Sequence, residues 1–228
     1  GRQFHLYPHA GRSYDLNSNT VRALFEDSEH RIWMSKRDGK IEVYTNELSY
    51  LGYLTEGGMI AKNGQPLSGV AYHIMQDSKG NIWIATKGKG VVLAQPDGGG
   101  YKLIRFEYNE DDIYSLSHNS AYWLHEDKHG RIWVATFGGG LNYIDRTPEG
   151  NYIFINNRNN LKGFPTDRFY RLRHITSDRK GNIWVSGTDG ALCFKEDFRE
   201  PESIKFHLYA PVPGDMNCLS SSNVYRIL

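Results

Sequence analysis

Arginine and tyrosine side chains recur at one position of this chain where they could bind a sugar or an acidic group. Each stands one residue after an apolar residue in a repeated phrase: Arg22, Tyr72, Tyr122, Arg173 and Tyr225. A guanidinium can bind a carboxylate through paired hydrogen bonds, and tyrosine offers an aromatic face together with a hydroxyl. The same side chains could instead fill the crevices between neighbouring elements with their stems. The sequence leaves both interpretations open.

A second candidate group lies in short turns that vary within the otherwise regular phrase: Lys36, Arg37, Lys87, Lys89 and Phe137. Variable turns on a regular scaffold are where recognition residues are commonly placed. The four cations would form a local positive patch that favours an anionic oligosaccharide, although they could also be ordinary solvated turn residues. We therefore predict a ligand-binding surface made by the following residues: Arg22, Lys36, Arg37, Tyr72, Lys87, Lys89, Tyr122, Phe137 and Arg173.

The remaining reactive residues indicate no catalytic site, metal site or cofactor. His125 and His129 are four residues apart, but they flank a strand and a turn rather than a helix face, and no metal-binding motif accompanies them. The chain contains no nucleophile elbow, phosphate-binding loop or dinucleotide fingerprint. His73 and His174 share a repeat position whose other members are Ala and Trp, so we expect them to pack.

The two cysteines do not form a disulfide framework or a metal motif. Cys193 lies in a strand-like apolar run and is expected to be a small core residue. Cys218 lies in a polar loop, and the sequence leaves open whether the two are bridged.

Four tryptophans at steps of 50, 50 and 51 residues indicate a repeated structural unit that positions these side chains: Trp33, Trp83, Trp133 and Trp184. An aspartate precedes each of them by six residues: Asp27, Asp77, Asp127 and Asp178. Exposed tryptophans could stack on sugars, and the aspartates could serve acid–base chemistry or bind Ca²⁺. Their fixed spacing behind a turn favours inter-blade packing for Trp and a local backbone turn for Asp.

One repeat divides into four short strands, at 70–76, 81–86, 91–94 and 101–108, joined by glycine turns. Four antiparallel strands in ~50 residues are typical of a β-propeller blade. We predict an all-β fold, a single β-propeller region over 1–228 in four-stranded antiparallel blades. The predicted whole blades cover about 21–56, 70–108, 120–157 and 171–209, with an outer strand at 4–7 and a partial blade, an inner strand, at 223–228.

Four blades with two single strands do not close easily into a ring, whereas six to eight blades would need roughly 300–400 residues. We therefore expect the remaining blades of a parent chain, or a second copy, as a partner. Lys and Arg number 27 and Asp and Glu 26, a net charge of +1, which argues against nucleic acid and against an anionic membrane surface as partners. No apolar run reaches membrane-spanning length, and the chain starts without Met or a signal peptide. Any membrane contact is expected through a segment outside this sequence.

Three stretches of the chain resemble the two-component regulator propeller repeat: Asp77 to Thr86, Ser115 to Ser120 and Gly138 to Tyr143. The first repeat departs from the pattern with His30 in place of the turn glycine, and the fourth has Gly187 where Thr is usual. Both departures concern local turn geometry.

The resemblance implies the periplasmic sensor region of a bacterial hybrid two-component system histidine kinase. Such proteins combine two propellers, an immunoglobulin-like connector, a membrane helix, a histidine kinase and a response regulator, and many respond to breakdown products of polysaccharides. For this region it implies signal sensing through an oligosaccharide, without catalysis. Two alternatives stay open: a propeller enzyme acting on a polysaccharide or lactone, with blades similar to those of streptogramin lyase, and a protein-interaction propeller.

Overall fold

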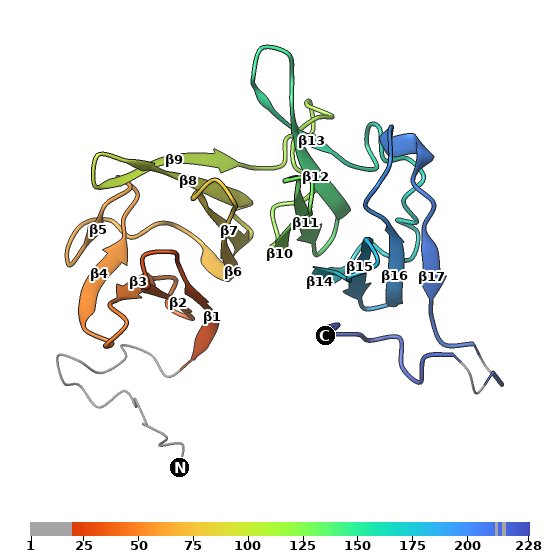
Figure 1. Cartoon of the computed structure of the whole chain (residues 1–228), viewed down its shortest axis with the longest axis horizontal. Coiled ribbons are helices and arrows are strands. Elements are labelled where there is room, and N and C mark those ends of the chain that lie inside the picture. Colours follow the sequence, from red (N-terminus) through yellow and green to blue (C-terminus); the bar gives the residue numbers. More distant parts are fainter. Residues whose placement is uncertain (1–19, 213, 216–217) are drawn as a thin grey trace.

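The computed structural model describes residues 20–212, 214–215 and 218–228. Within these residues the strands form four antiparallel sheets, and the strand order in every sheet follows the sequence. The sheets succeed one another along an arc, with the first strand of each turned toward the centre (Figure 1). The arrangement is that of β-propeller blades, and the predicted fold is confirmed.

Blade 1 contains β1 (Val21–Glu26), β2 (Ile32–Lys36), β3 (Ile41–Tyr44), β4 (Tyr50–Leu54) and β5 (Ile60–Ala61). Blade 2 contains β6 (Val70–Gln76), β7 (Ile82–Lys87), β8 (Val91–Asp97) and β9 (Gly100–Phe106). Blade 3 contains β10 (Ala121–Glu126), β11 (Ile132–Thr136), β12 (Gly140–Arg146) and β13 (Tyr152–Ile155). Blade 4 contains β14 (Leu172–Ser177), β15 (Asn182–Gly187), β16 (Gly190–Lys195), the 3₁₀ turn η1 (Pro201–Ser203) and β17 (His207–Tyr209). The short β5, which pairs with β4, was not predicted.

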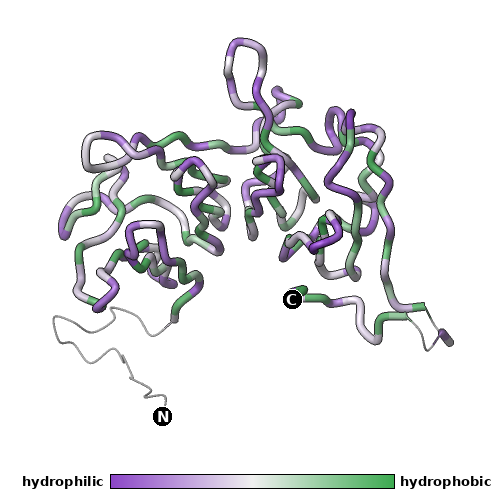
Figure 2. The backbone as a smooth tube through the Cα atoms, in the orientation of Figure 1, coloured by the Kyte–Doolittle hydropathy of each residue, from purple (hydrophilic) through white to green (hydrophobic). Residues whose placement is uncertain are grey.

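The core consists of three clusters, one at each seam between neighbouring blades. At the second seam, Trp83 and Leu93 of blade 2 pack with Leu124 and Val134 of blade 3. Figure 2 shows apolar residues along the strands and hydrophilic residues in many of the turns. Blades 2 and 3 therefore bury one face against the preceding blade and the other against the next, which holds the sheets in a fixed order.

The repeated aspartate anchors the tryptophan of its own blade. The indole Nε1–H donates to the Asp Oδ2 in every blade, at 2.7 Å for Trp33, 2.8 Å for Trp83, and 2.9 Å for both Trp133 and Trp184. The Asp127 Oδ1 also accepts the backbone N–H groups of His129 and Arg131. Both residues thus have the structural role predicted for them, because the buried indole needs an acceptor and the turn needs its donors satisfied.

The turn of the first blade keeps the backbone shape of the others despite lacking their glycine. His30 has φ of 60°, close to the 70° of Gly181 at the equivalent position. A side chain in this left-handed region costs about 1 kcal/mol relative to glycine. The departure noted in the sequence therefore changes the energy of the turn rather than its geometry.

We expect His30→Gly to raise the free energy of unfolding by up to about 1 kcal/mol, because it relieves this strain. The imidazole is exposed and pairs with Glu26 at the surface, and the loss of such a pair costs little. Urea titration of the variant measures the change. Glu29→Gly, one residue earlier in the same turn, serves as the control and should lower stability, and an equal effect of the two variants would contradict the explanation.

The predicted inner strand at 223–228 is corrected: these residues form no strand. They nevertheless lie where a fifth inner strand would lie. The Ile227 N–H donates to His174 Nδ1 at 3.4 Å, as the equivalent Leu124 N–H donates to His73 Nδ1 at 3.2 Å. A ladder needs a neighbouring strand, and among the described residues none pairs with this segment. The outer strand predicted at 4–7 lies outside the described residues.

Both cysteines are free thiols, so the bridge left open by the sequence is not formed. Cys193 is buried in β16, as expected for a core residue. Within the part of the chain that the structure describes, no helix has the length and apolarity needed to cross a membrane.

Candidate functional site

The first strand of every blade contains an irregularity at the same repeat position. Its pairing register with the second strand shifts between Val21 and Ala23, and at the equivalent steps in the other three blades. The residues inside these steps are the candidates singled out by the sequence: Arg22, Tyr72, Tyr122 and Arg173. A β-bulge leaves its extra residue outside the ladder and re-aims the side chain, and bulges are enriched next to functional sites. The backbone therefore treats these four residues alike.

The aromatic members of this set form a continuous stack with Phe137, which follows β11. The rings of Tyr72 and Tyr122 lie 4.4 Å apart at 27°, and those of Tyr122 and Phe137 lie 4.9 Å apart at 21°. Blades 2 and 3 thus present three nearly parallel rings across one seam. The edges of such a stack, which are part-exposed here, offer an apolar surface to a flat or pyranose ring.

Arginines extend the stack into blade 4 and toward blade 1. The Arg173 Cζ lies 5.5 Å from the centre of the Phe137 ring and 4.2 Å from that of Tyr225. Burial raises the pKa of Tyr122, as does its hydrogen bond with the Tyr72 hydroxyl, while the positive charges of Arg173 and Arg22 act in the opposite direction. Both guanidiniums therefore lie close enough to influence the tyrosine hydroxyls. We name the set Arg22, Tyr72, Tyr122, Phe137 and Arg173 the bulge row.

One neighbour of the bulge row was missed by the sequence argument. The Arg171 Cζ lies 5.7 Å from the centre of the Phe137 ring and 4.9 Å from that of Tyr170. Phe137 and Arg171 also form an isolated bridge between the blades. No repeated position marks Arg171, so only the fold places it here.

Lys36 is corrected as a member of the predicted positive patch. Its side chain is fully buried in β2 and forms an ion pair with Glu42 of β3, which also accepts a hydrogen bond from the Tyr44 hydroxyl. Burial, followed by the bond to Glu42, raises the pKa of Tyr44. An ammonium held in this way is unavailable to a ligand.

The three other turn cations, Arg37, Lys87 and Lys89, are exposed. Exposure is expected both for a ligand-binding patch and for ordinary solvated turn residues. The Lys89 carbonyl accepts a hydrogen bond from Arg105 at 3.0 Å. Their participation in binding stays a prediction.

A second tier of stacked rings lies one residue further along the inner strands. The His73 and Trp123 rings are 3.7 Å apart, those of Trp123 and His174 are 4.4 Å apart, and the Arg226 Cζ lies 5.4 Å from the Trp123 ring. The histidines pack, as expected. Burial lowers the pKa of His73 to about 3 and that of His174 to about 4, and the charge of Arg226 and the neighbouring His125 reinforce both shifts.

We expect the free energy of unfolding to fall by at least ~2 kcal/mol as the pH is lowered from about 6.5 toward 4. The reason is that these two histidines bind protons in the unfolded chain over this range, whereas in the folded protein they stay largely neutral. Well above the unfolded-state pKa of 6.5 both are neutral in either state and the contribution is complete. Chemical unfolding at several pH values measures the slope. His73→Asn should flatten it, whereas His207→Asn, at an exposed position of β17, should leave it unchanged. The same slope in all three proteins would refute this explanation.

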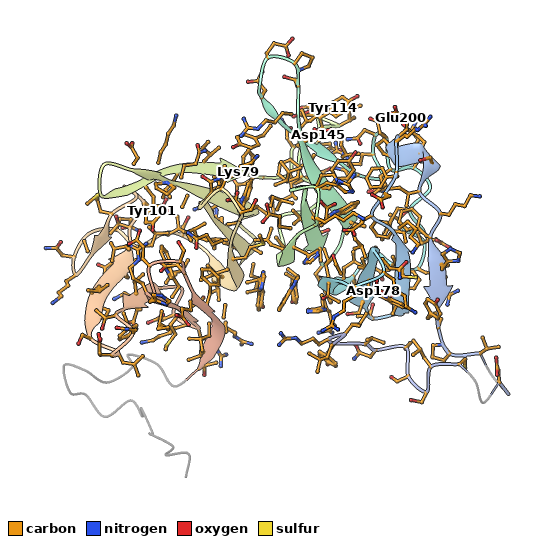
Figure 3. The ribbon with its side chains drawn as sticks, in the orientation of Figure 1. Lys79, Tyr101, Tyr114, Asp145, Asp178 and Glu200 are labelled. Carbon is orange, nitrogen blue, oxygen red and sulfur yellow. The ribbon has the colours of Figure 1, made fainter. Side chains whose placement is uncertain are left out.

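Two of the hollows that lie away from the bulge row contain several acidic side chains. One, of about 760 Å³, is lined by the turns after β10 and β14, and three of its acids, Asp127, Asp178 and Glu196, already accept bonds from Trp133, Trp184 and Lys128. The other, of about 450 Å³, is lined by residues including Tyr114, Asp145 and Glu200. In Figure 3 Asp178 lies near β15, and Tyr114, Asp145 and Glu200 lie toward the outer edge of blades 3 and 4. Neither hollow gathers the repeated residues as the bulge row does, and among the described residues no cluster of His, Cys, Asp and Glu could hold a metal ion.

Three segments of the chain, 15–35, 65–88 and 115–138, match the family described as two component regulator propeller. These three segments are similar to two-component regulator propeller repeats. The two matches at 65–88 and 115–138 contain Tyr72, Tyr122 and the strands that hold them. No curated protein sequence matches the chain.

Solved propellers are similar to the repeats in structure but distant in sequence. The extracellular domain of BT4673 from B. thetaiotaomicron, described as a hybrid two component system, has a TM-score of 0.61 at 20% identity, over 90% of this chain and 26% of that one. Virginiamycin B lyase from Staphylococcus aureus has a TM-score of 0.56 at 13% identity, over 87% of this chain and 58% of the lyase. The Cps50 (Swd1) propeller of Myceliophteria thermophila has a TM-score of 0.56 at 10% identity, over 87% and 61%. The chain thus spans about a quarter of the BT4673 domain, and these likenesses show the fold.

Proposed function

We propose that the chain is a ligand-sensing propeller region of a hybrid two-component signalling protein, located in the periplasm, and that it binds an oligosaccharide across the bulge row. The repeat family and the likeness to an extracellular domain support the signalling context. The observation that carries the binding site is the recurrence of one β-bulge in four blades, each presenting Arg or Tyr. A purely structural repeat has no need for aligned, part-exposed aromatic and guanidinium groups at its irregularities.

The signal would be a change in the population of two arrangements of the sensor. A ligand shifts such an equilibrium only through a difference in its affinity for the two states. The bulge row draws side chains from separate blades, so its geometry depends on how the blades stand relative to one another. A bound ring would favour the arrangement in which Tyr72, Tyr122 and Phe137 remain stacked.

Further blades, from the parent chain or a second copy, are proposed to cover the outer face of blade 1. Leu24 on this face is 65% exposed, whereas the equivalent Ile74, Leu124 and Ile175 are 1–2% exposed because the preceding blade covers them. At the opposite end, Trp184 is partly exposed while the other three repeat tryptophans are buried. Both end faces thus have the chemistry of an inter-blade seam. Sedimentation would reveal pairing of two copies, and Leu24→Asp should abolish it.

Calorimetry of the chain against a panel of neutral and acidic oligosaccharides tests the proposal, with chromatography of the same mixtures to detect cleavage. We expect binding without turnover, and an affinity at least about tenfold weaker for Tyr122→Ala, since central aromatic residues dominate binding energy. Tyr209→Ala, in the exposed part of β17, is the matched control. Turnover would instead support the propeller enzyme, and the absence of binding to any glycan would overturn the sensor proposal and favour a protein-interaction propeller.

A further inference from the structure

The arginines at the bulge row lack acidic partners within the described part of the chain. No ion pair there involves Arg22, Arg171 or Arg173. By contrast, Arg31 and Arg131 each bond an aspartate at 2.7 Å. In a chain whose net charge is only +1, uncompensated guanidiniums gathered at one place create a local positive potential.

One donor atom of Arg173 also lacks a hydrogen-bond partner. Its Nε is buried and has no hydrogen-bond acceptor among the described residues. Buried polar groups in folded proteins almost always have a partner, and each exception needs an explanation. The rings of Phe137 and Tyr225 lie beside its guanidinium, and the Nε–H remains a donor without an acceptor among the described residues.

The tyrosine hydroxyls add a further donor. The Tyr72 and Tyr122 rings stack 4.4 Å apart, and a hydrogen bond between their two hydroxyls would use only one of the two protons. The second proton stays available to an acceptor outside the pair. Because Arg173 and Arg22 both act electrostatically on Tyr122, that acceptor would meet one hydroxyl donor and two cationic groups.

We propose that the bulge row selects ligands in which a ring carries an anionic group, a carboxylate or a sulfate. The ring lies across the part-exposed edges of the stacked tyrosine and phenylalanine rings, and the anion accepts hydrogen bonds from Arg173, with Arg22 supplying long-range attraction. This inference rests on the ligand-binding function proposed above and names its ligand class. An acidic sugar and an aromatic acid share this chemistry, and a neutral sugar lacks it.

Calorimetry with three probes separates the possibilities: digalacturonate, its neutral dimethyl ester and benzoate. For the unmodified chain at low salt we expect digalacturonate to bind at least about tenfold more tightly than the ester, because a charge-assisted bond to a guanidinium is lost in the ester. In 0.5 M NaCl the preference should shrink, since the anion site is partly exposed.

Arg173→Gln should reduce the preference to about threefold or less while leaving the affinity for the ester nearly unchanged. Arg22→Gln should reduce it less, by lowering the general attraction alone. Arg179→Gln makes the same charge change in the same blade, in the turn beyond the opposite end of β14, and should behave as the unmodified chain. Circular dichroism and the melting temperature establish that each variant is folded.

Equal binding of digalacturonate and its ester by the unmodified chain would overturn the anion inference and leave the oligosaccharide proposal intact. Binding of benzoate, lost in Arg173→Gln, without binding of either sugar would support the anion class and overturn the oligosaccharide proposal. A preference that survives both arginine variants would also overturn the inference, because the anion would then be held elsewhere. Absence of binding by all three probes overturns both.

Discussion

Replacing Trp133 by alanine is expected to lower the free energy of unfolding by about 3–5 kcal/mol. The indole is fully buried at the third seam, with ring centres 4.9 Å from Tyr143 and 5.0 Å from Phe194. Its removal leaves a cavity between two blades and deprives Asp127 of one of its hydrogen-bond donors. Chemical unfolding followed by circular dichroism measures the loss.

Trp184→Ala provides the matched control. Trp184 makes the same bond to its aspartate, at 2.9 Å, but it lies on the last face of blade 4 and is partly exposed. Less apolar area returns to water when it is truncated, so we expect a loss of roughly 1–2 kcal/mol. Equal losses at Trp133 and Trp184 would show that the seam contributes nothing beyond the aspartate bond.

Lys36→Ala is expected to cost about 3–5 kcal/mol, because it leaves the carboxylate of Glu42 buried without its ammonium partner. Both side chains are fully buried, so solvent cannot replace the lost partner. Lys87→Ala, in an exposed position of the next blade, should change stability by no more than about 0.5 kcal/mol. Urea titrations of the two variants measure the difference.

The double substitution Lys36→Met with Glu42→Leu shows whether the loss comes from the orphaned charge. Leucine stands at the equivalent position of blade 4, Leu192, where it is fully buried. We expect the double variant to recover most of the stability lost by Lys36→Ala, since a buried ion pair can often be replaced by apolar side chains at little cost. A double variant as unstable as the single one would mean that the pair itself, rather than the isolated carboxylate, decides the stability.

The architecture could be predicted because one strong signal recurs at a fixed period. A large apolar Trp behind a turn Asp can repeat four times only if the same supersecondary unit repeats, and burial of the Trp explains why the unit needs neighbours. The bond between the two residues could also have been inferred, since a buried indole requires an acceptor and the Asp is the nearest constant one. The lack of a strand at 223–228 could not, because pairing depends on a neighbour and not on the segment itself.

The candidate site was predictable in part. Buried inner-strand residues such as Ala71 and Ile74 stand three apart instead of the two that regular alternation requires, and this spacing indicates a bulge. The burial of Lys36 left no such signal, because its partner Glu42 lies on another strand and the sequence does not state which face of β2 each side chain occupies. Arg171 reaches Phe137 only through the contact between blades 3 and 4.

Each blade contributes a single bulge side chain from its innermost strand, so the candidate site lies where the inner strands of the otherwise rigid blades meet. Four strands about 5 Å apart make a blade roughly 15 Å deep from its innermost to its outermost strand. A small tilt of one blade at its innermost strand therefore becomes a larger displacement at its outer edge. A ligand bound by Tyr72, Tyr122 and Arg173 would restrict the tilting of three adjacent blades. Ligand binding near the propeller axis would then change the mobility and position of the outer blade edges. A neighbouring domain that contacts those edges could respond without touching the ligand.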